Sequence, residues 1–373
     1  MKVIHYLRFC LGVERESQAP DKNEWKNIYD FCLKQSLLGI GYDGLEKLSN
    51  SYSIETNIKY QWIGDANQVI LRNKLLNQRC IELQEMFAED GFATIILKGQ
   101  GNALMYPNPL LRQPGDIDIW VLSKDRNKKF GVNRILEFLN SKIDIKKQII
   151  GYHHVVFPIF DDVEVEVHWR PSWRSSPLYN NRLQKWFRNH SGYTEIKELP
   201  DRKGKIIVPS WEFNVIFQLQ HMFLHIFQEG LGLRQVLDYY YLLRSSEKLE
   251  MRNEELEMTL KHLGLWKFAG AVMYVLREVF LLEEQYLIAP VDERRGKHML
   301  SEILQSGNFG QYDERNKSLH QKSGIARSLA RAKRQLHFLR DYPHETLCAP
   351  YQIYHVIWRK LKLWRWEDRF FWI

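Results

Sequence analysis

One short stretch decides the fold of this chain: Gly115-Asp116-Ile117-Asp118-Ile119-Trp120-Val121. Acidic residues alternate there with β-branched and aromatic residues, which is the pattern of a half-buried β-strand. Successive side chains of a strand point to opposite faces of the sheet. We therefore expect Asp116 and Asp118 on one face, and Ile117 and Ile119 on the other.

A second stretch repeats this alternation further along the chain: Val163-Glu164-Val165-Glu166-Val167-His168-Trp169. As a strand it would place Glu164, Glu166 and His168 on one face. Carboxylates crowded on one face of a sheet repel one another. A divalent cation would neutralise them, and Mg²⁺ takes oxygen ligands while leaving room for substrate phosphates. The two stretches together predict a metal site.

Length and composition are ordinary for a globular protein of two or three modules. The chain has 373 residues, of which 45% are hydrophobic and 26% are charged. Its apolar runs are shorter than a membrane span, and Arg8 interrupts the apolar start that a signal peptide would need. The four cysteines lie far apart and show neither disulfide nor zinc-site spacing. These features predict a cytoplasmic protein.

The formal net charge of +8 fits a polyanionic partner such as a nucleoside triphosphate or nucleic acid, and fits equally well a charge that only maintains solubility. The C-terminal part of the chain is basic and aromatic. Such a segment can bind nucleic acid or an anionic membrane surface. The alternative is a terminal helix whose aromatic side chains pack on the body. Its residues include Arg340, Trp358, Arg359, Lys360, Trp364 and Trp366.

The remaining pattern predicts helices, then a small mixed unit, then helices again. Apolar residues recur with helical spacing over about 22–86 and from Trp211 onward. Between these regions, residues 93–97 form a short apolar run typical of a buried strand, and residues 102–106 predict a short helix that ends before Pro107. Residues 153–160 and 163–169 predict two strands joined by a turn. The fold class expected is therefore α+β.

Several motifs together resemble the bacterial uncharacterised nucleotidyltransferase family of the polymerase-β-like nucleotidyltransferase superfamily. The resemblance runs over most of the chain and is sharpest at the two acidic stretches. The motifs are Ile95-Ile96-Leu97-Lys98-Gly99, Tyr106-Pro107, Leu111-Arg112-x-Pro114-Gly115-Asp116-Ile117-Asp118-Ile119, Val165-Glu166-Val167-His168-Trp169, His221-x-x-x-His225 and Leu233-Arg234-Gln235-Val236-Leu237-Asp238.

This resemblance implies a small mixed β-sheet nucleotidyltransferase core flanked by N-terminal and C-terminal helical domains. The boundaries expected are an N-terminal helical region over 1–87, the α/β core over 88–200, a helical domain over 201–320, and the basic aromatic segment over 321–373. The implied activity is the Mg²⁺- or Mn²⁺-dependent transfer of a nucleoside monophosphate from a nucleoside triphosphate to an acceptor hydroxyl, with release of pyrophosphate. Protein, RNA, sugar and small-molecule acceptors all stay open.

The resemblance also assigns roles to residues. Metal binding and catalysis fall to Asp116, Asp118 and Glu166, with Glu164 as the alternative third carboxylate. Phosphate binding falls to Lys98, Gly99, Gln100 and Arg112. Typical members have Gly-Ser or Gly-Gly where this chain has Gly99-Gln100, and Gly101-Asn102 is an alternative phosphate turn.

Other roles remain open. Arg112 would contact the triphosphate or pair with Asp116. His168, and one of His153 and His154, would face the acidic side. The pair His221 and His225 has metal-ligand spacing but core-like neighbours, and Arg234 and Asp238 are spaced for an ion pair on a helix surface. Two further functions use the same fold: a non-catalytic nucleotide- or protein-binding module, and a metal-dependent phosphodiesterase.

Overall fold

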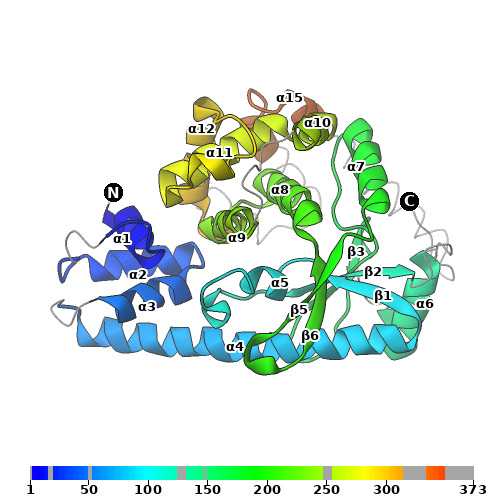
Figure 1. The fold of residues 1–373 in the computed structure, drawn as a ribbon, viewed down its shortest axis with the longest axis horizontal. Helices are drawn as coiled ribbons and strands as arrows, with labels where there is room; N and C mark the ends of the chain where they lie inside the picture. Colours follow the sequence, from blue (N-terminus) through cyan, green and yellow to red (C-terminus); the bar gives the residue numbers. More distant parts are fainter. Residues whose placement is uncertain are drawn as a thin grey trace. The chain divides into compact units, whose positions relative to one another are not determined.

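The computed structural model describes residues 2–15, 20–48, 53–123, 132–145, 148, 150–246, 254–313 and 333–348 (Figure 1). The chain forms two compact units. The first unit comprises residues 1–74, 102–114 and 218–327, and the second comprises residues 75–101, 115–217 and 328–373. Both units are therefore assembled from segments that lie far apart in the sequence.

The first unit is helical. Its elements are α1 (Lys2–Cys10), α2 (Trp25–Lys34), α3 (Leu38–Lys47), the first part of α4 (Thr56–Glu89), η1 (Pro109–Leu111), most of α8 (Trp211–Gln228), α9 (Leu233–Arg244), α10 (Glu254–His262), α11 (Trp266–Phe280), η4 (Glu284–Tyr286), α12 (Glu293–Ser306) and η5 (Asn308–Gly310). Helix α11 is buried along most of its length and packs against α9 and α12. The rings of Tyr6, Trp25 and Trp62 form a second apolar cluster at the N-terminal helices.

The second unit contains a four-stranded mixed sheet in the order β1-β2-β4-β3. Its strands are β1 (Phe92–Ile96), β2 (Ile117–Ser123), β3 (His154–Val156) and β4 (Val165–His168). Strand β2 pairs antiparallel with β1 and parallel with β4, and β4 pairs antiparallel with β3. The unit also holds α6 (Val132–Lys142), α7 (Pro177–Asn189), the hairpin of β5 (Thr194–Glu198) and β6 (Lys205–Pro209), η3 (Pro200–Arg202) and α15 (Pro343–Leu347).

Apolar side chains fix the acidic strand in this sheet. Ile117, Ile119 and Val121 of β2 are buried, as the alternation predicts, but Asp118 and Trp120 are buried as well, so the strand is not half-buried as expected. The ring of Phe138 on α6 packs against the rings of Phe87 and Phe92, which belong to α4 and β1. Burial of several large side chains stabilises this packing by about 1.5–3 kcal/mol per side chain. The predicted α+β class with a small mixed sheet is confirmed.

Some element boundaries differ from those expected. The predicted helix over 102–106 is instead α5 (Gln100–Ala103), which begins directly after Gly99. Strand β3 ends at Val156, well before residue 160, and Pro158 has no N–H to donate to a strand ladder. Residues 314–332 and 349–373 lie outside the described part of the chain. The predicted roles of the basic aromatic segment fall mostly on those residues.

None of the described helices is both long enough and apolar enough to cross a bilayer.

Candidate active site

The parallel pairing of β2 and β4 brings the two acidic stretches together. Asp118 is the register partner of Glu166, and Trp120 is the partner of His168. Because the side-chain period of a strand is two, Glu166 and His168 then share the face that carries Asp118. Asp116 directly precedes β2 in the chain. The sheet thus gathers side chains from two strands at one place.

Glu166 and Glu164 have different environments. Glu166 lies within β4, is half-buried, and its Oε2 is 3.3 Å from His168 Nε2. Glu164 precedes the strand and is exposed. Partial burial, together with the charges of Asp116 and Glu166, raises the pKa of Glu164. Register and burial therefore both favour Glu166 as the third carboxylate of the site.

Two basic side chains contact Asp118, which is only 2% exposed. Lys98 Nζ is 3.0 Å from Asp118 Oδ2, and His168 Nε2 is 2.9 Å from Asp118 Oδ1. An ionised carboxylate with so little access to water needs such partners, because an unpaired buried charge is very costly. The carboxylate therefore depends on nearby positive charge.

The charges of the site shift its pKa values in opposite directions. Burial acts to raise the pKa of Asp118 and of Glu166, but Lys98 and His168 lower both, that of Glu166 to about 2. Burial likewise acts to lower the pKa of His168, but its bonds to the two carboxylates raise it to about 9. The pKa of Lys98 is raised, against the effect of burial, by the charges of Asp118, Asp116 and Glu166. Asp118 and Glu166 are therefore ionised at neutral pH, and both lie close enough to Lys98 to stabilise its ammonium.

The turn between β1 and α5 adopts the conformation that the Lys98-Gly99 motif predicts. Gly99 has φ of 58°, in the left-handed region that glycine tolerates best. A Cβ at this position would lie 3.4 Å from the carbonyl oxygen of Asp116. The Leu97 N–H also donates to the carbonyl oxygen of Asp118 over 3.0 Å. The backbone of this turn is therefore held against the start of β2.

The side chain of Gln100, which is expected to bind phosphate, already has a hydrogen-bond partner within the protein. It is 3% exposed, and its amide donates to Asn77 Oδ1 on α4. This bond anchors the turn to the long helix. A contact between Gln100 and a phosphate would therefore have to come from its backbone N–H.

Both neighbouring histidines join the cluster, where the strand alternation predicted one. His154 is the register partner of His168, and His153 lies just before the first residue of β3. His153 Nε2 is 2.8 Å from His154 Nδ1, and His154 Nε2 is 3.6 Å from Glu166 Oε1. Strict alternation fails here because His153 is outside the regular strand. Burial is the largest cause that lowers the pKa values of both histidines.

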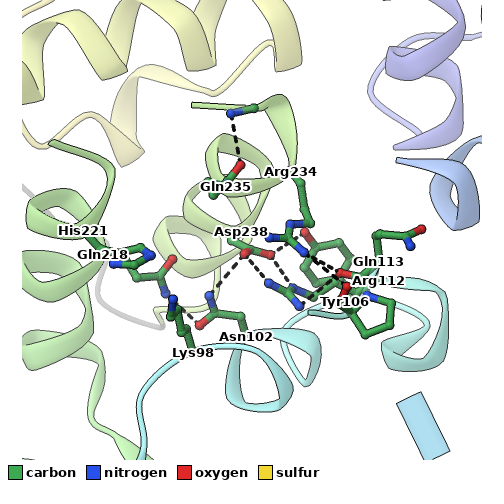
Figure 2. A network of polar contacts seen from close by, with 12 residues as sticks. Lys98, Asn102, Tyr106, Arg112, Gln113, Gln218, His221, Arg234, Gln235 and Asp238 are labelled. Atoms are coloured by element: carbon green, nitrogen blue, oxygen red, sulfur yellow. Dashed lines mark hydrogen bonds and ion pairs between the residues drawn. The ribbon is translucent and has the colours of Figure 1, made fainter. Parts of the chain in front are cut away.

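Arg112 has an acidic partner that the sequence did not indicate. Its Nε and Nη2 each lie 2.7 Å from a carboxylate oxygen of Asp238, a bidentate geometry within the helical unit (Figure 2). Tyr106 Oη and Asn102 Nδ2 also donate to Asp238, over 2.7 and 3.3 Å. Burial acts to raise the pKa of Asp238, but Arg112 lowers it. The sequence left two roles open for Arg112, phosphate contact and pairing with Asp116. Neither of them includes this bond to Asp238.

The expectation of a surface ion pair between Arg234 and Asp238 is wrong. The two residues are only 7% and 3% exposed, so they lie in the interior. Arg234 Nη1 donates to the carbonyl oxygen of Gln113 over 3.1 Å. Helical spacing alone could not reveal this, because α9 is covered on the side that was expected to face water.

His221 and His225 lie on α8 and contact each other. Their Nε2 atoms are 2.9 Å apart, and His225 Nδ1 is 3.4 Å from a carboxylate oxygen of Glu229. Both rings are half-buried. The two rings therefore pair with each other, whereas His225 Nδ1 lies at ion-pair distance from Glu229 without forming a hydrogen bond.

The chain was compared with known proteins. No match was found among curated proteins. Among solved structures, one match is the crystal structure of an antigenic nucleotidyltransferase-like protein from Paracoccidioides brasiliensis, with 12% identity, a TM-score of 0.33, and coverage of 61% of this chain and 96% of that one.

The comparison with protein families is more informative. The profile described as "Uncharacterised nucleotidyltransferase" matches residues 21–281, which is more than half of the 373 residues. The match includes both acidic strands, the Lys98-Gly99 turn and Asp238. The chain therefore belongs to the uncharacterised nucleotidyltransferase family.

Proposed function

We propose that this protein transfers a nucleoside monophosphate from a nucleoside triphosphate to an acceptor hydroxyl in a reaction that depends on Mg²⁺ or Mn²⁺. Membership of a nucleotidyltransferase family supports the reaction class. The observation that carries the proposal is the register pairing of Asp118 with Glu166 beside Lys98. Asp118 and Glu166 form an ionised carboxylate pair next to the Lys98 ammonium. Nucleotidyl transfer needs carboxylates to hold the metal ion and a cation to bind the phosphates.

The carboxylates suit a hard divalent cation. One ligand atom each from Asp118, Glu166 and His168 lies within 4.8 Å of the others, and the charge of Asp116 also acts on Lys98. Asp116, Asp118 and Glu166 would hold the ion, because oxygen donors are the ligands that Mg²⁺ prefers. When bound, such an ion neutralises charge on the transferring phosphoryl group and on the leaving pyrophosphate.

The protein's own groups account for the rest of the reaction. Lys98 and the backbone of the Gly99 turn would bind the phosphates and keep the α-phosphorus near the carboxylates. The acceptor oxygen then forms a bond to the α-phosphorus, and the bond from that phosphorus to the oxygen of the leaving pyrophosphate breaks. Glu166 is ionised at neutral pH and would take the proton of the acceptor hydroxyl as that oxygen bonds to the α-phosphorus.

One observation favours a second candidate, a non-catalytic nucleotide-binding module. Lys98 and His168 already pair with Asp118 at 3.0 and 2.9 Å. Lys98 and His168 therefore balance the charges of Asp118 and Glu166 without a metal ion. A protein that had lost catalysis would retain this arrangement for stability.

The test is a labelling experiment with all four nucleoside triphosphates, each labelled at the α-phosphate, in Mg²⁺ or Mn²⁺. The expected result is label transfer to the protein itself or to a cell-extract acceptor, with release of pyrophosphate. Asp118→Asn should reduce the rate at least about 1000-fold, which corresponds to about 4 kcal/mol.

The matched control is Asp161→Asn, at an exposed acidic residue outside the strands of the same unit. It should leave the rate unchanged. Metal-dependent binding of triphosphate without label transfer would instead establish the non-catalytic module. Cleavage of nucleic acid without release of pyrophosphate from a triphosphate would establish a phosphodiesterase.

A further inference from the structure

The strongest feature that nucleotidyl transfer leaves unexplained is the group of three imidazoles beside the carboxylates. One ring nitrogen each from His153, His154 and His168 lies within 4.8 Å of the others. The ring centroids of His153 and His154 are 4.1 Å apart, and those of His154 and His168 are 5.1 Å apart. Oxygen-only chemistry with Mg²⁺ gives these nitrogen donors no role.

The two ring nitrogens of His154 have different surroundings. Its Nδ1 faces His153 Nε2 at 2.8 Å, and its Nε2 faces Glu166 Oε1 at 3.6 Å. A metal-binding histidine usually directs one nitrogen at the ion and donates the other N–H to a carboxylate. His154 could therefore bind an ion through Nδ1, in place of its hydrogen bond to His153, with Glu166 as the outer partner of Nε2.

The two ring nitrogens of His168 also have different surroundings. Its Nε2 is bound by Asp118 at 2.9 Å and by Glu166 at 3.3 Å. Its Nδ1 is buried and has no hydrogen-bond partner among the described residues, and the same is true of His153 Nδ1. A buried polar atom without a partner costs about 1–3 kcal/mol. This cost would be removed at His168 if its Nδ1 bound an ion.

We infer that His153, His154 and His168 form a nitrogen-donor site for a divalent transition-metal ion of the Zn²⁺ or Co²⁺ type, next to the carboxylate site. Glu166 and Asp118 act as the outer partners that orient His154 and His168. Three imidazoles suit Zn²⁺, which binds histidine nitrogen at about 2.0–2.1 Å in tetrahedral sites. The fourth position would take water or a substrate group.

The test uses Co²⁺ as a spectroscopic probe on the full chain, produced without a histidine tag and stripped of metal. Four- or five-coordinate Co²⁺ absorbs visible light strongly, whereas six-coordinate Co²⁺ absorbs weakly. We expect the strong band at one ion per chain, and we expect Zn²⁺ to displace Co²⁺ and abolish it. His154→Gln should reduce Zn²⁺ affinity at least about 100-fold, and Glu166→Gln about 10- to 100-fold.

Two matched variants serve as controls. His262→Gln removes an exposed histidine on α10, and Asp116→Asn removes a carboxylate of the proposed nucleotide site. Both should keep the strong band. Loss of the band in Asp116→Asn but not in His154→Gln would overturn the inference. Because Asp116→Asn should abolish nucleotidyl transfer, the two proposals can fail separately.

A second measurement needs no variant and therefore does not depend on the folding of one. Pulsed electron paramagnetic resonance of Cu²⁺ bound to the wild-type chain counts the imidazole nitrogens coupled to the ion. Two or more coupled imidazoles are expected. One or none, or only the weak six-coordinate spectrum with Co²⁺, would show that the histidines do not form a metal site.

Discussion

Asp118 on β2 lies directly opposite Glu166 on β4, in a pair of parallel strands. The two carboxylates come from residues 48 positions apart, yet the register places them on one face of the sheet. His168 bonds to both of them, at 2.9 and 3.3 Å. The two acidic stretches therefore form a single electrostatic unit, and neither could be ionised at low cost without the basic groups beside them.

The first prediction separates Glu166 from Glu164. Glu166→Gln should reduce kcat for nucleotidyl transfer about 100-fold or more, because it removes a charge that holds the metal ion. Glu164→Gln should change kcat by less than about 3-fold, since this side chain is exposed and precedes the strand. Steady-state release of pyrophosphate measures both. The reverse order of effects would assign the third carboxylate to Glu164.

The second prediction concerns the left-handed turn. Gly99→Ala should lower the free energy of unfolding by about 1–2 kcal/mol, because φ of 58° is unfavourable for a residue with a Cβ. Gly64→Ala is the matched control, at an exposed position of α4 where a Cβ meets nothing within 4 Å. It should raise stability by about 0.5–1 kcal/mol. Urea unfolding measures the free energy of unfolding of both variants. If Gly99→Ala changed this free energy as Gly64→Ala does, the turn would carry no strain.

The third prediction concerns the buried ion pair. Asp238→Ala should cost about 3–5 kcal/mol, because it leaves the Arg112 guanidinium buried without this carboxylate. Replacing both partners, with Arg112→Met and Asp238→Leu, should cost much less than the sum of the single changes. The control is Asp30→Ala in the exposed pair with Lys26, where about 0.5 kcal/mol or less is expected. Additive effects in denaturant titrations would contradict the coupling.

The fourth prediction is the pH dependence of that pair. Arg112 holds the pKa of Asp238 below its usual range in the folded protein. In the unfolded chain Asp238 binds a proton near its ordinary pKa of about 3.9. Its stabilising contribution is therefore complete above that pH and is lost as the pH falls through the lower, folded pKa.

The stability difference between the wild-type chain and Asp238→Asn should accordingly be constant from about pH 7 to about pH 5, and should shrink below about pH 4. Urea titrations at several pH values measure it. A difference that grew as the pH fell would mean that Asp238 is protonated in the folded protein.

Much of the fold could be predicted from local patterns. Alternation at Asp116–Val121 correctly indicated that Ile117, Ile119 and Val121 are buried, because side-chain direction in a strand depends only on the backbone of neighbouring residues. It did not indicate that Asp118, on the opposite face, is also buried, because other segments cover that face. Gly99 correctly indicated a turn after the first strand, because glycine tolerates the left-handed conformation. The ends of β3 and α5 were harder to predict, since ladder bonds and caps involve other segments.

The sequence by itself determined which carboxylates share a strand face, that a glycine turn precedes them, and, through its motifs, the family. Only the tertiary structure decided that Glu166 lies opposite Asp118, that His153 and His154 join His168, and that Arg112 pairs with Asp238 across 126 positions. The physical reason is that backbone preferences act between neighbours along the chain. Partners of buried charges are chosen by the packing of segments that local patterns do not connect.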